Sequence, residues 1–428
     1  MANMSIRVPM SCPDITAAEV EAVTGVLQTP YLSIGPRIAE FEEHFAAYVG
    51  ARHAVGVSSG TAGLHLGAIA AGVGQGDLVL TTPFSFVASA NVILYERAIP
   101  VFVDIDPKTL NIDPALVAEA VHDLTQGGPS AQRWLPPTMR NPKSRIRNPK
   151  SRIPNPKSKI LNPKSILPVH AFGQPADMDP ILEVAQEYDL TVLEDACEAL
   201  GAEYKGRRIG TQPETCNRKL AAVFAFYPNK QITTGEGGMI VTDRDDWDAL
   251  FRSLRNQGRD VFDAWLNHSR LGYNYRLDEM SAALGLAQLN RIEELLGRRE
   301  RVAQWYNERL KDMEGLQVPY IAPATTRMSW FVYVIRLRPG IDRRTVMAAL
   351  EERGIPSRPY FTPIHLQPFY RERFGYRAGD FPMTEEVARS TLALPFSGVM
   401  AEEQVEYVCR HLPAAIRAGL APPHRAEV

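Results

Sequence analysis

The sequence predicts an α/β protein built around a mostly parallel sheet, and three observations support this fold class. Between residues 53 and 243, short apolar runs alternate with helical stretches, the pattern of strands joined by crossover helices. These runs are mostly apolar throughout, as expected of a sheet covered by helices on both faces. The composition, with 45% hydrophobic and 22% charged residues among 428, is that of an ordinary globular protein.

The individual elements follow from the spacing of apolar residues. Two helices are expected first, over residues 15–28 and 38–50, because apolar residues recur there at helical spacing. Strands are expected next, over residues 53–60, 77–86, 99–106, 165–173, 190–200, 221–228 and 237–243. Later elements are a helical stretch over 280–310, a strand at 329–337 and helices at 343–354 and 402–416. This order predicts a large domain over residues 1–250 and a smaller α+β domain over residues 251–428.

A basic repeat interrupts the alternation of helices and strands. The stretch "NPKSRIRNPKSRIPNPKSKILNPKSI", residues 141–166, contains four copies of NPKS and no acidic residue. A proline in every copy argues against a continuous helix, and the low apolar content predicts a solvated loop. We expect a passive insertion at about residues 125–165, because loops tolerate long insertions at small entropic cost. A nucleic-acid-binding arm is the alternative, since blocks of like charge are often interaction segments.

Charge, cysteine spacing and hydropathy argue against several classes of protein. The 47 Lys and Arg residues against 49 Asp and Glu leave a formal charge of -2, so no overall field draws the chain to nucleic acid or to an anionic membrane. The four cysteines lie far apart without a CxxC pair, which argues against a metal site and a disulfide framework. Neither a signal-peptide pattern nor a membrane-spanning run occurs, so we expect a cytoplasmic protein without a membrane or nucleic-acid partner.

Chemically unusual residues follow four of the expected strands, at the edge where ligands bind in an open α/β sheet. After the first strand, "SSGTAG" leads into a helix whose first N–H groups would hold a phosphate, with an ordinary helix cap as the alternative. Glu194 and Asp195 close another strand, where a buried carboxylate needs a positive or hydrogen-bonding partner, with a helix cap as an equal alternative. Lys230 follows two aromatic residues and precedes a glycine-rich turn, with a surface lysine as the alternative. Phe84 and Phe86 lie beyond a fourth strand, with a core aromatic residue as the default interpretation of either.

Together the four strand ends indicate one ligand. It would have a phosphate, a flat ring, a ring nitrogen that favours a carboxylate, and a group that reacts with a lysine amine. Pyridoxal 5'-phosphate has these features, with Lys230 as its Schiff-base partner and Asp195 keeping the ring nitrogen protonated. We therefore predict this cofactor.

Six motifs resemble, in the same order, the signatures of the DegT/DnrJ/EryC1/StrS sugar aminotransferases. They are "SSGTAGLHL", "PFSFVASANVILYERAIPVFVDID", "PVHAFGQPADM", "EDACEALGA", "FAFYPNKQITTGEGGMIVT" and "LGYNYRLDEMSAALGLAQL". The resemblance covers almost the whole chain except residues 124–164. It implies the aspartate-aminotransferase fold (fold type I) and a homodimer with shared active sites. It also implies transfer of an amino group from L-glutamate to a nucleotide-linked keto sugar in amino-sugar and polysaccharide biosynthesis.

The resemblance also implies roles for residues around the cofactor ring. Lys230 would be the Schiff-base lysine and the proton shuttle, and Asp195 would partner the ring nitrogen. Phe86 would stack on the ring. Glu198 would lie near the ring hydroxyl, where many members have glutamine. Ala225 replaces a serine that contacts the phosphate in many members, so that contact would be lost.

The remaining contacts implied by the resemblance concern the phosphate and the substrate. Gly60, Thr61 and Ala62 would hold the phosphate, and Asn274 would reach the phosphate of the neighbouring subunit. The candidates for substrate contact are Tyr31, Ser33, Tyr360 and His365, and a purely structural role for His365 is an equal alternative.

Three other functions are weighed against this one. Family members that are sugar dehydratases replace the lysine with histidine, so Lys230 disfavours a dehydratase of the same fold. A regulatory or nucleic-acid-binding relative would use the basic repeat, and its binding would weaken steeply with salt. A pyridoxal-phosphate enzyme acting on a small amino acid is disfavoured by the family motifs alone.

Overall fold

A seven-stranded sheet forms the centre of the computed structural model, which describes residues 8–140, 163–211, 219–260 and 267–420. The strand order is β1-β9-β8-β5-β4-β2-β3. The strands are β1 (His53–Val57), β2 (Leu78–Thr81), β3 (Ile99–Phe102), β4 (Pro163–Leu167), β5 (Thr191–Asp195), β8 (Leu220–Ala225) and β9 (Gly238–Thr242). Among the described strands of this sheet, β9 alone runs against its neighbours β1 and β8, and the other pairs are parallel. The predicted mostly parallel α/β sheet is confirmed.

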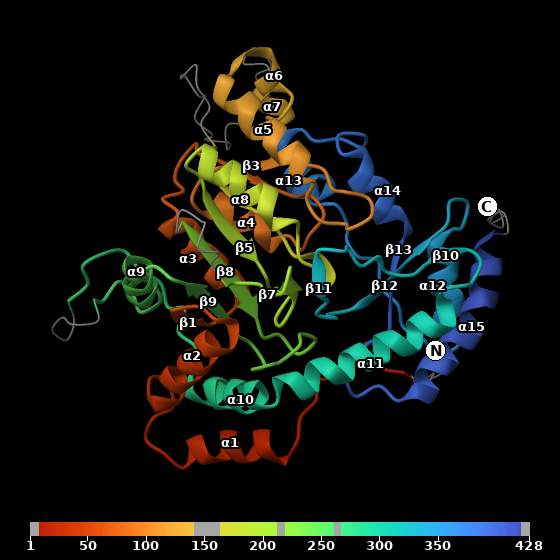
Figure 1. Ribbon diagram of the computed structural model, residues 1–428, viewed down its shortest axis with the longest axis horizontal. Coiled ribbons are helices and arrows are strands. Elements are labelled where there is room, and N and C mark those ends of the chain that lie inside the picture. Colours follow the sequence, from red (N-terminus) through yellow and green to blue (C-terminus); the bar gives the residue numbers. More distant parts are fainter. Residues whose placement is uncertain (1–7, 141–162, 212–218, 261–266, 421–428) are drawn as a thin grey trace.

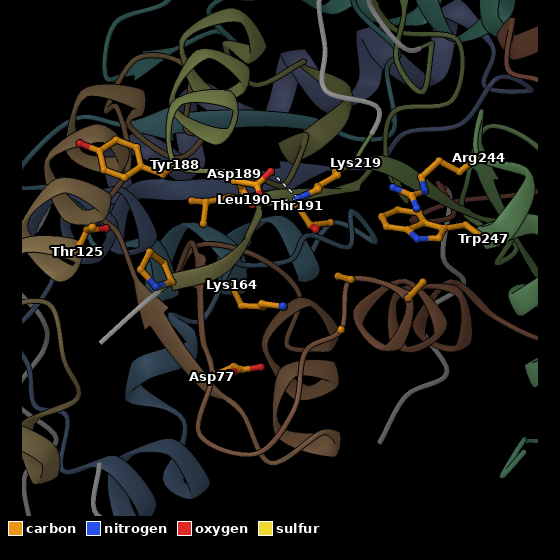
Figure 2. A pocket seen from close by; sticks show the side chains of 14 residues that line it. Asp77, Thr125, Lys164, Tyr188, Asp189, Leu190, Thr191, Lys219, Arg244 and Trp247 are labelled. Carbon is orange, nitrogen blue, oxygen red and sulfur yellow. Dashed lines mark hydrogen bonds and ion pairs between the residues drawn. The ribbon is translucent and has the colours of Figure 1, made fainter. Parts of the chain in front are cut away.

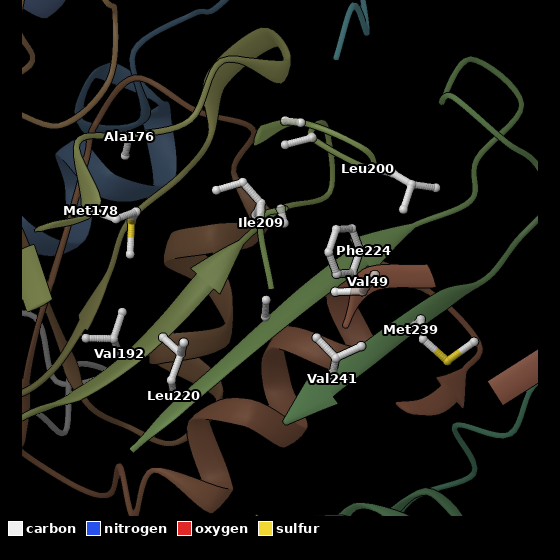
Figure 3. Packing of buried hydrophobic residues seen from close by; sticks show 14 of the residues in the cluster. Val49, Ala176, Met178, Val192, Leu200, Ile209, Leu220, Phe224, Met239 and Val241 are labelled. Atoms are coloured by element: carbon white, nitrogen blue, oxygen red, sulfur yellow. The ribbon is translucent and has the colours of Figure 1, made fainter. Parts of the chain in front are cut away.

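Helices cover both faces of this sheet, which explains the continuous apolar runs. The helices are α2 (Pro36–Val49), α5 (Pro114–Gln126), α8 (Met178–Glu187) and α10 (Glu279–Asn290) in one layer, and α3 (Gly60–Ala70), α4 (Ala88–Tyr95) and α9 (Asp245–Arg255) in the other. Successive residues of β8 face opposite layers: Ala222 and Phe224 pack with the first, Ala221 and Val223 with the second. Figure 3 shows Phe224 of the first core together with Val49 of α2. Both faces of the strand are therefore buried.

A second, smaller unit contains an antiparallel sheet in the order β10-β12-β13. Its elements are β10 (Leu316–Gln317), β12 (Tyr333–Leu337), β13 (Thr391–Leu394), α11 (Ile292–Leu310), α12 (Arg343–Glu351) and α15 (Glu402–Leu420). Side chains of these elements form a separate core, in which Tyr306 and Tyr333 stack with ring centroids 4.6 Å apart. Figure 1 shows α11 running from beside α10 to this second unit.

The expected division of the chain at residue 250 remains a prediction. The core of the large sheet includes Leu277 and Leu296, and the second core includes Val302 and later residues. The two cores therefore both receive side chains from α11.

The helical stretch expected over residues 280–310 consists of two helices, α10 and α11, separated at Arg291. The side chain of Arg291 forms ion pairs with Asp14 and Glu19, and the neighbouring Gln288 donates to Glu19. These contacts fasten the end of α10 to α1 (Ala17–Leu27), so that α11 can leave in another direction. The spacing of apolar residues does not reveal such a break.

The basic repeat falls mostly on residues 141–162, which lie outside the described residues. Residues 163–165 of its last copy are described, and they already belong to β4, with Pro163 opposite Leu78 and Ser165 opposite Val79 of β2. The strand thus begins earlier than the expected Ser165. Before the repeat, the short helices α6 (Gly128–Gln132) and α7 (Pro137–Arg140) occupy part of the expected loop.

The remaining elements are short. They are β6 (Glu203–Tyr204), β7 (Arg207–Arg208), β11 (Thr325–Arg327), the 3-10 turns η1 (Ala171–Gly173) and η2 (Ile364–Leu366), α13 (Pro368–Phe374) and α14 (Pro382–Ser390). Of the helices in the described ranges, none has both the length and the apolar character needed to span a bilayer.

Candidate active site

The carboxyl ends of β1, β5 and β8 meet at one edge of the large sheet. Gly238 of β9 lies opposite both Val57, the last residue of β1, and Ala225, the last residue of β8. A Cβ atom on Gly238 would lie only 2.7 Å from the carbonyl carbon of Ser59. Glycine at this position therefore lets the start of α3 approach the ends of these strands, beside Asp195 at the end of β5.

The start of α3 carries two N–H groups that the helix itself does not use. The Ser59 hydroxyl accepts a hydrogen bond from the Ala62 N–H at 3.1 Å, and the Ser59 carbonyl accepts one from the Gly63 N–H. The N–H groups of Gly60 and Thr61 precede these bonds, so they are available to a ligand at the positive end of the helix dipole. The Ala62 N–H, in contrast, already donates to the helix-capping Ser59 hydroxyl, although Ala62 was predicted to hold the phosphate with Gly60 and Thr61.

Asp195 presents a buried carboxyl group that has no cationic partner among the described residues. Its Oδ2 accepts a hydrogen bond of 2.6 Å from Ser89 Oγ, and its Oδ1 accepts one from the Cys197 N–H. Ser89 in turn contacts Ser85. Only 6% of Asp195 is exposed, and in the described part of the chain it forms no ion pair. A buried carboxylate in this state favours a cationic ligand group.

Lys230 lies between a carboxylate and an aromatic ring. Its Nζ is 3.8 Å from Glu198 Oε1 and 3.9 Å from the centroid of the Phe331 ring, and 13% of its side chain is exposed. The backbone N–H of Lys230 donates to the Tyr227 carbonyl, which fixes the turn after β8. Lys230 is therefore not a surface lysine. Phe331 comes from the second unit, and nothing in the sequence around Lys230 indicates that this ring lies beside the amine.

Glu198 is held in a buried position that faces Lys230. Its Oε2 accepts a hydrogen bond of 2.8 Å from the Phe172 N–H, and 8% of the residue is exposed. Burial raises the pKa of the Glu198 carboxyl, and the nearby Lys230 amine opposes that rise. The carboxylate can therefore hold a proton more readily than an exposed glutamate.

Two further observations bear on whether pyridoxal phosphate fits these residues. Phe86 is 64% exposed, unusually open for a phenylalanine, and it can stack on a flat ring. Asn229 Oδ1, next to Lys230, is buried without a hydrogen-bond partner among the described residues. With the unneutralised Asp195 and the free N–H groups of α3, these residues fit the cofactor.

Asn274 lies in a segment that is fixed on both sides while its own side chain is exposed. The rings of Tyr273 and Tyr275 stack with centroids 5.0 Å apart, and both contact His65 of α3. His65 also binds Glu96 at 2.8 Å and the Tyr275 hydroxyl at 3.1 Å. This aromatic cluster, which sequence reasoning missed, presents Asn274 away from the body of its own chain.

The predicted substrate residues lie in different environments. Tyr31 is 56% exposed and Ser33 is exposed, and within the described ranges neither forms a hydrogen bond with Lys230. Burial raises the pKa of the Tyr360 hydroxyl, and the negative charge of Glu198 adds to that rise, so Tyr360 lies close to the site. His365 is fully buried.

The surroundings of His365 agree with a structural role. Its Nε2 contacts Glu385 Oε1 at 3.0 Å, and its ring packs against Phe381 with centroids 4.7 Å apart. Burial lowers the pKa of the His365 imidazole. Its contact with substrate remains a prediction.

His170 is a second buried histidine close to the site. Its Nε2 contacts Glu194 Oε2 at 2.8 Å, and its Nδ1 accepts a hydrogen bond from the Ala176 N–H. Since Nδ1 is an acceptor, the proton of the neutral ring is on Nε2, which donates to Glu194. The pair braces the end of β5 that carries Asp195. The sequence places His170 inside an expected strand and does not indicate this role.

A separate open cavity of about 620 Å³ lies at the opposite edge of the sheet. Its lining includes Pro163 and Thr191, the first residues of β4 and β5, and none of the predicted site residues is among the described residues that line it. Figure 2 shows Lys219 facing Asp189 there, at 2.5 Å. The chemistry predicted from the sequence therefore belongs to the other edge.

Comparison with known proteins is consistent with this geometry. The model of the DegT/DnrJ/EryC1/StrS aminotransferase family matches residues 13–413. The chain is 36% identical over 406 residues to GDP-perosamine synthase of Caulobacter vibrioides, covering 94% of this chain and 96% of that protein. It is 36% identical over 414 residues to the spore coat polysaccharide biosynthesis protein SpsC of Bacillus subtilis, covering 94% and 95%.

A solved aminotransferase structure also matches almost the whole chain. The crystal structure of DesV from S. venezuelae matches with a TM-score of 0.79 and 31% identity, covering 96% of this chain and 98% of DesV. The fold is that of the fold type I aminotransferases, which depend on pyridoxal phosphate. The chain belongs to the DegT/DnrJ/EryC1/StrS aminotransferase family, and it is a sugar aminotransferase.

Proposed function

We propose that this aminotransferase uses pyridoxal 5'-phosphate to move an amino group from L-glutamate to a nucleotide-linked keto sugar. The observation that carries the proposal is the position of the half-buried Lys230, whose amine lies between Glu198 and Phe331 at the sheet edge where Asp195 and the start of α3 meet. The names of two relatives, GDP-perosamine synthase and a polysaccharide biosynthesis protein, support a sugar nucleotide as the acceptor.

The residues at this edge divide the work of binding and proton transfer. The cofactor supplies an aldehyde that takes up an amino group and a ring that withdraws electrons. Lys230 would hold the cofactor through its Nζ and, when free, would move a proton at that atom. Asp195 would keep the ring nitrogen protonated, and Ser89 orients the Asp195 carboxylate. Phe86 would cover the ring and exclude water.

The phosphate and the substrate would be held by residues further from Lys230. Gly60 and Thr61 offer their N–H groups to the phosphate. Tyr31, Ser33 and Tyr360 are the proposed contacts of the sugar nucleotide, since all three are accessible or lie near Glu198. A cytoplasmic location remains a prediction.

A homodimer with shared sites is also part of the proposal. Asn274 is exposed on a segment held by stacked tyrosines, and Leu271 nearby is 85% exposed. An exposed leucine beside an oriented amide suits a contact with a second copy of the chain. Asn274 would then reach the phosphate of the partner subunit.

The proposed reaction is tested by visible absorption of the purified protein with pyridoxal phosphate, before and after L-glutamate. A visible band that L-glutamate bleaches is expected. Lys230→Ala should lose the band and turnover while retaining noncovalent cofactor binding in equilibrium dialysis, and Lys311→Ala, at the exposed end of α11, should behave as wild type. Full turnover of Lys230→Ala would refute the assignment, and a band that ignores L-glutamate would indicate another donor.

The shared site is tested by Asn274→Ala. Cofactor affinity should fall by about tenfold, equivalent to about 1.4 kcal/mol. Mixing this variant with Lys230→Ala should restore sites in mixed dimers, in which one site combines Asn274 from one chain with Lys230 from the other. Unchanged cofactor affinity, measured by titration, would contradict the contact between subunits.

A further inference from the structure

Arg299 of α11 is buried, and its guanidinium hydrogen bonds to backbone carbonyls of two distant segments. Nη2 donates to the Lys230 carbonyl at 2.6 Å and to the Asn229 carbonyl at 3.2 Å. Nη1 donates to the carbonyls of Trp330 and Phe331 at 3.3 and 3.2 Å. One planar group thus joins the turn that carries the reactive lysine to the segment that leads into β12.

The two segments joined by Arg299 meet again at the lysine amine. The Phe331 ring, whose backbone Arg299 holds, lies 3.9 Å from Lys230 Nζ. A ring face at this distance attracts a protonated amine. The guanidinium therefore sets the spacing between the backbone of Lys230 and the ring next to its amine.

Arg299 holds these segments through the planar arrangement of its N–H donors rather than through an ion pair. Only 4% of the residue is exposed, and within the described ranges no carboxylate forms an ion pair with it. Burial lowers the pKa of the guanidinium to about 10. A lysine could not take its place, because a single ammonium cannot reach two pairs of carbonyls in one plane.

Gln231, the residue after the lysine, makes a similar link on the side of Glu198. Its Nε2 donates to the Glu198 carbonyl at 2.6 Å and to Ser329 Oγ at 2.8 Å. Residues 329–331 are therefore fastened both to Lys230 and to Glu198, the two groups that form the surroundings of the amine.

We propose that Arg299 is a positioning residue for the transfer reaction, which holds the Phe331 ring against the Lys230 amine by bracing the backbone of both residues. This inference rests on the proposed function, in which Lys230 alternately binds the cofactor and moves a proton. Arg299 contacts the backbone carbonyls of Lys230 and Phe331 and acts through these two residues.

The test compares Arg299→Lys, Phe331→Leu and the double variant as holoenzymes. Each single variant should lower kcat by about ten- to hundredfold, since small misplacements of a reacting group cost that much, while KM for L-glutamate changes less than about threefold. The rate at which the apoprotein incorporates pyridoxal phosphate should fall in parallel. Because both changes act on one contact, the double variant should be little worse than either single variant.

Two controls separate positioning from general stability. Arg298→Lys alters the neighbouring arginine, which is 39% exposed and pairs with Asp14, and it should leave kcat and cofactor incorporation unchanged. Guanidinium ions added to Arg299→Ala should restore part of the lost rate, which a merely destabilised protein would not show.

The outcomes are decisive in each case. Arg299→Lys with lowered stability but wild-type kcat and incorporation rate would overturn the inference, and so would fully additive effects in the double variant. If Arg299→Lys fails to fold, Phe331→Leu provides the test. A wild-type kcat in this variant, which lacks the ring, would also overturn the inference. Wild-type protein without a visible cofactor band would overturn the proposed function itself, and the inference with it.

Discussion

Gly60→Ala should destabilise the protein and weaken cofactor binding together. A Cβ atom at position 60 would lie 2.7 Å from Cys197 Sγ and 2.8 Å from Ala225 Cβ. Cys197 can turn to another rotamer, but Ala225 has no side-chain torsion, so the backbone of α3 or β8 has to move. Overpacking of this kind costs about 1–3 kcal/mol.

The same movement displaces the N–H groups that face the phosphate. We expect a cofactor affinity about tenfold lower, equivalent to about 1.4 kcal/mol. Gly25→Ala is the matched control: a Cβ atom there meets nothing within 4 Å in the interior of α1, so alanine should stabilise by about 0.5–1 kcal/mol. Urea unfolding of the apoprotein and titration with pyridoxal phosphate measure the two effects. Wild-type stability and affinity in Gly60→Ala would refute the steric argument.

Two further predictions concern buried carboxylates. Burial acts to raise the pKa of Glu19, but hydrogen bonds from Thr16 and Gln288 outweigh it and hold that pKa at about 2, against 4.5 without these contacts. A lowered pKa stabilises the fold above pH 4.5 and that stability is lost as the pH falls toward 2. Glu19→Gln should therefore cost about 3 kcal/mol at pH 7 and flatten the acid limb of urea unfolding measured across pH; an unchanged acid limb would contradict the assignment. Ser89→Ala removes the 2.6 Å hydrogen bond to Asp195 and should cost about 1–3 kcal/mol in unfolding and weaken cofactor binding, with Ser85→Ala as the milder control. Equal effects of the two serine variants would show that the bond to the carboxylate is not what matters.

The sheet and the lysine turn could be predicted from the sequence because their signals are local. Apolar runs of strand length mark the seven strands of the large sheet, and the glycines after Lys230 mark a turn within a few residues of the lysine. Asp195 was found at the end of an apolar strand, and the family motifs then gave Phe86 its stacking role. Each of these inferences needed only residues close together along the chain.

The surroundings of the lysine amine could not be predicted in the same way. Phe331 and Arg299 reach Lys230 from about 70 to 100 positions further along, and nothing in their own neighbourhoods marks them as part of the site. Ser89 contacts Asp195 across 106 positions. Such contacts arise from how the second unit and α4 pack on the large sheet, which periodicity does not specify.

The entry of the last repeat copy into β4 has a consequence for strand register. In that copy the residue after NPKS is Ile166, which is 0% exposed in the core of the sheet. The same position in the three earlier copies holds Arg145, Arg152 and Lys159. A slip of the chain by one whole copy would keep the proline, lysine and serine in place but push a charge into the core, at a cost of several kcal/mol. Each of the four copies therefore carries the same proline, lysine and serine with which β4 begins. The apolar Ile166, which follows only the last copy, favours the register in which that copy begins the strand.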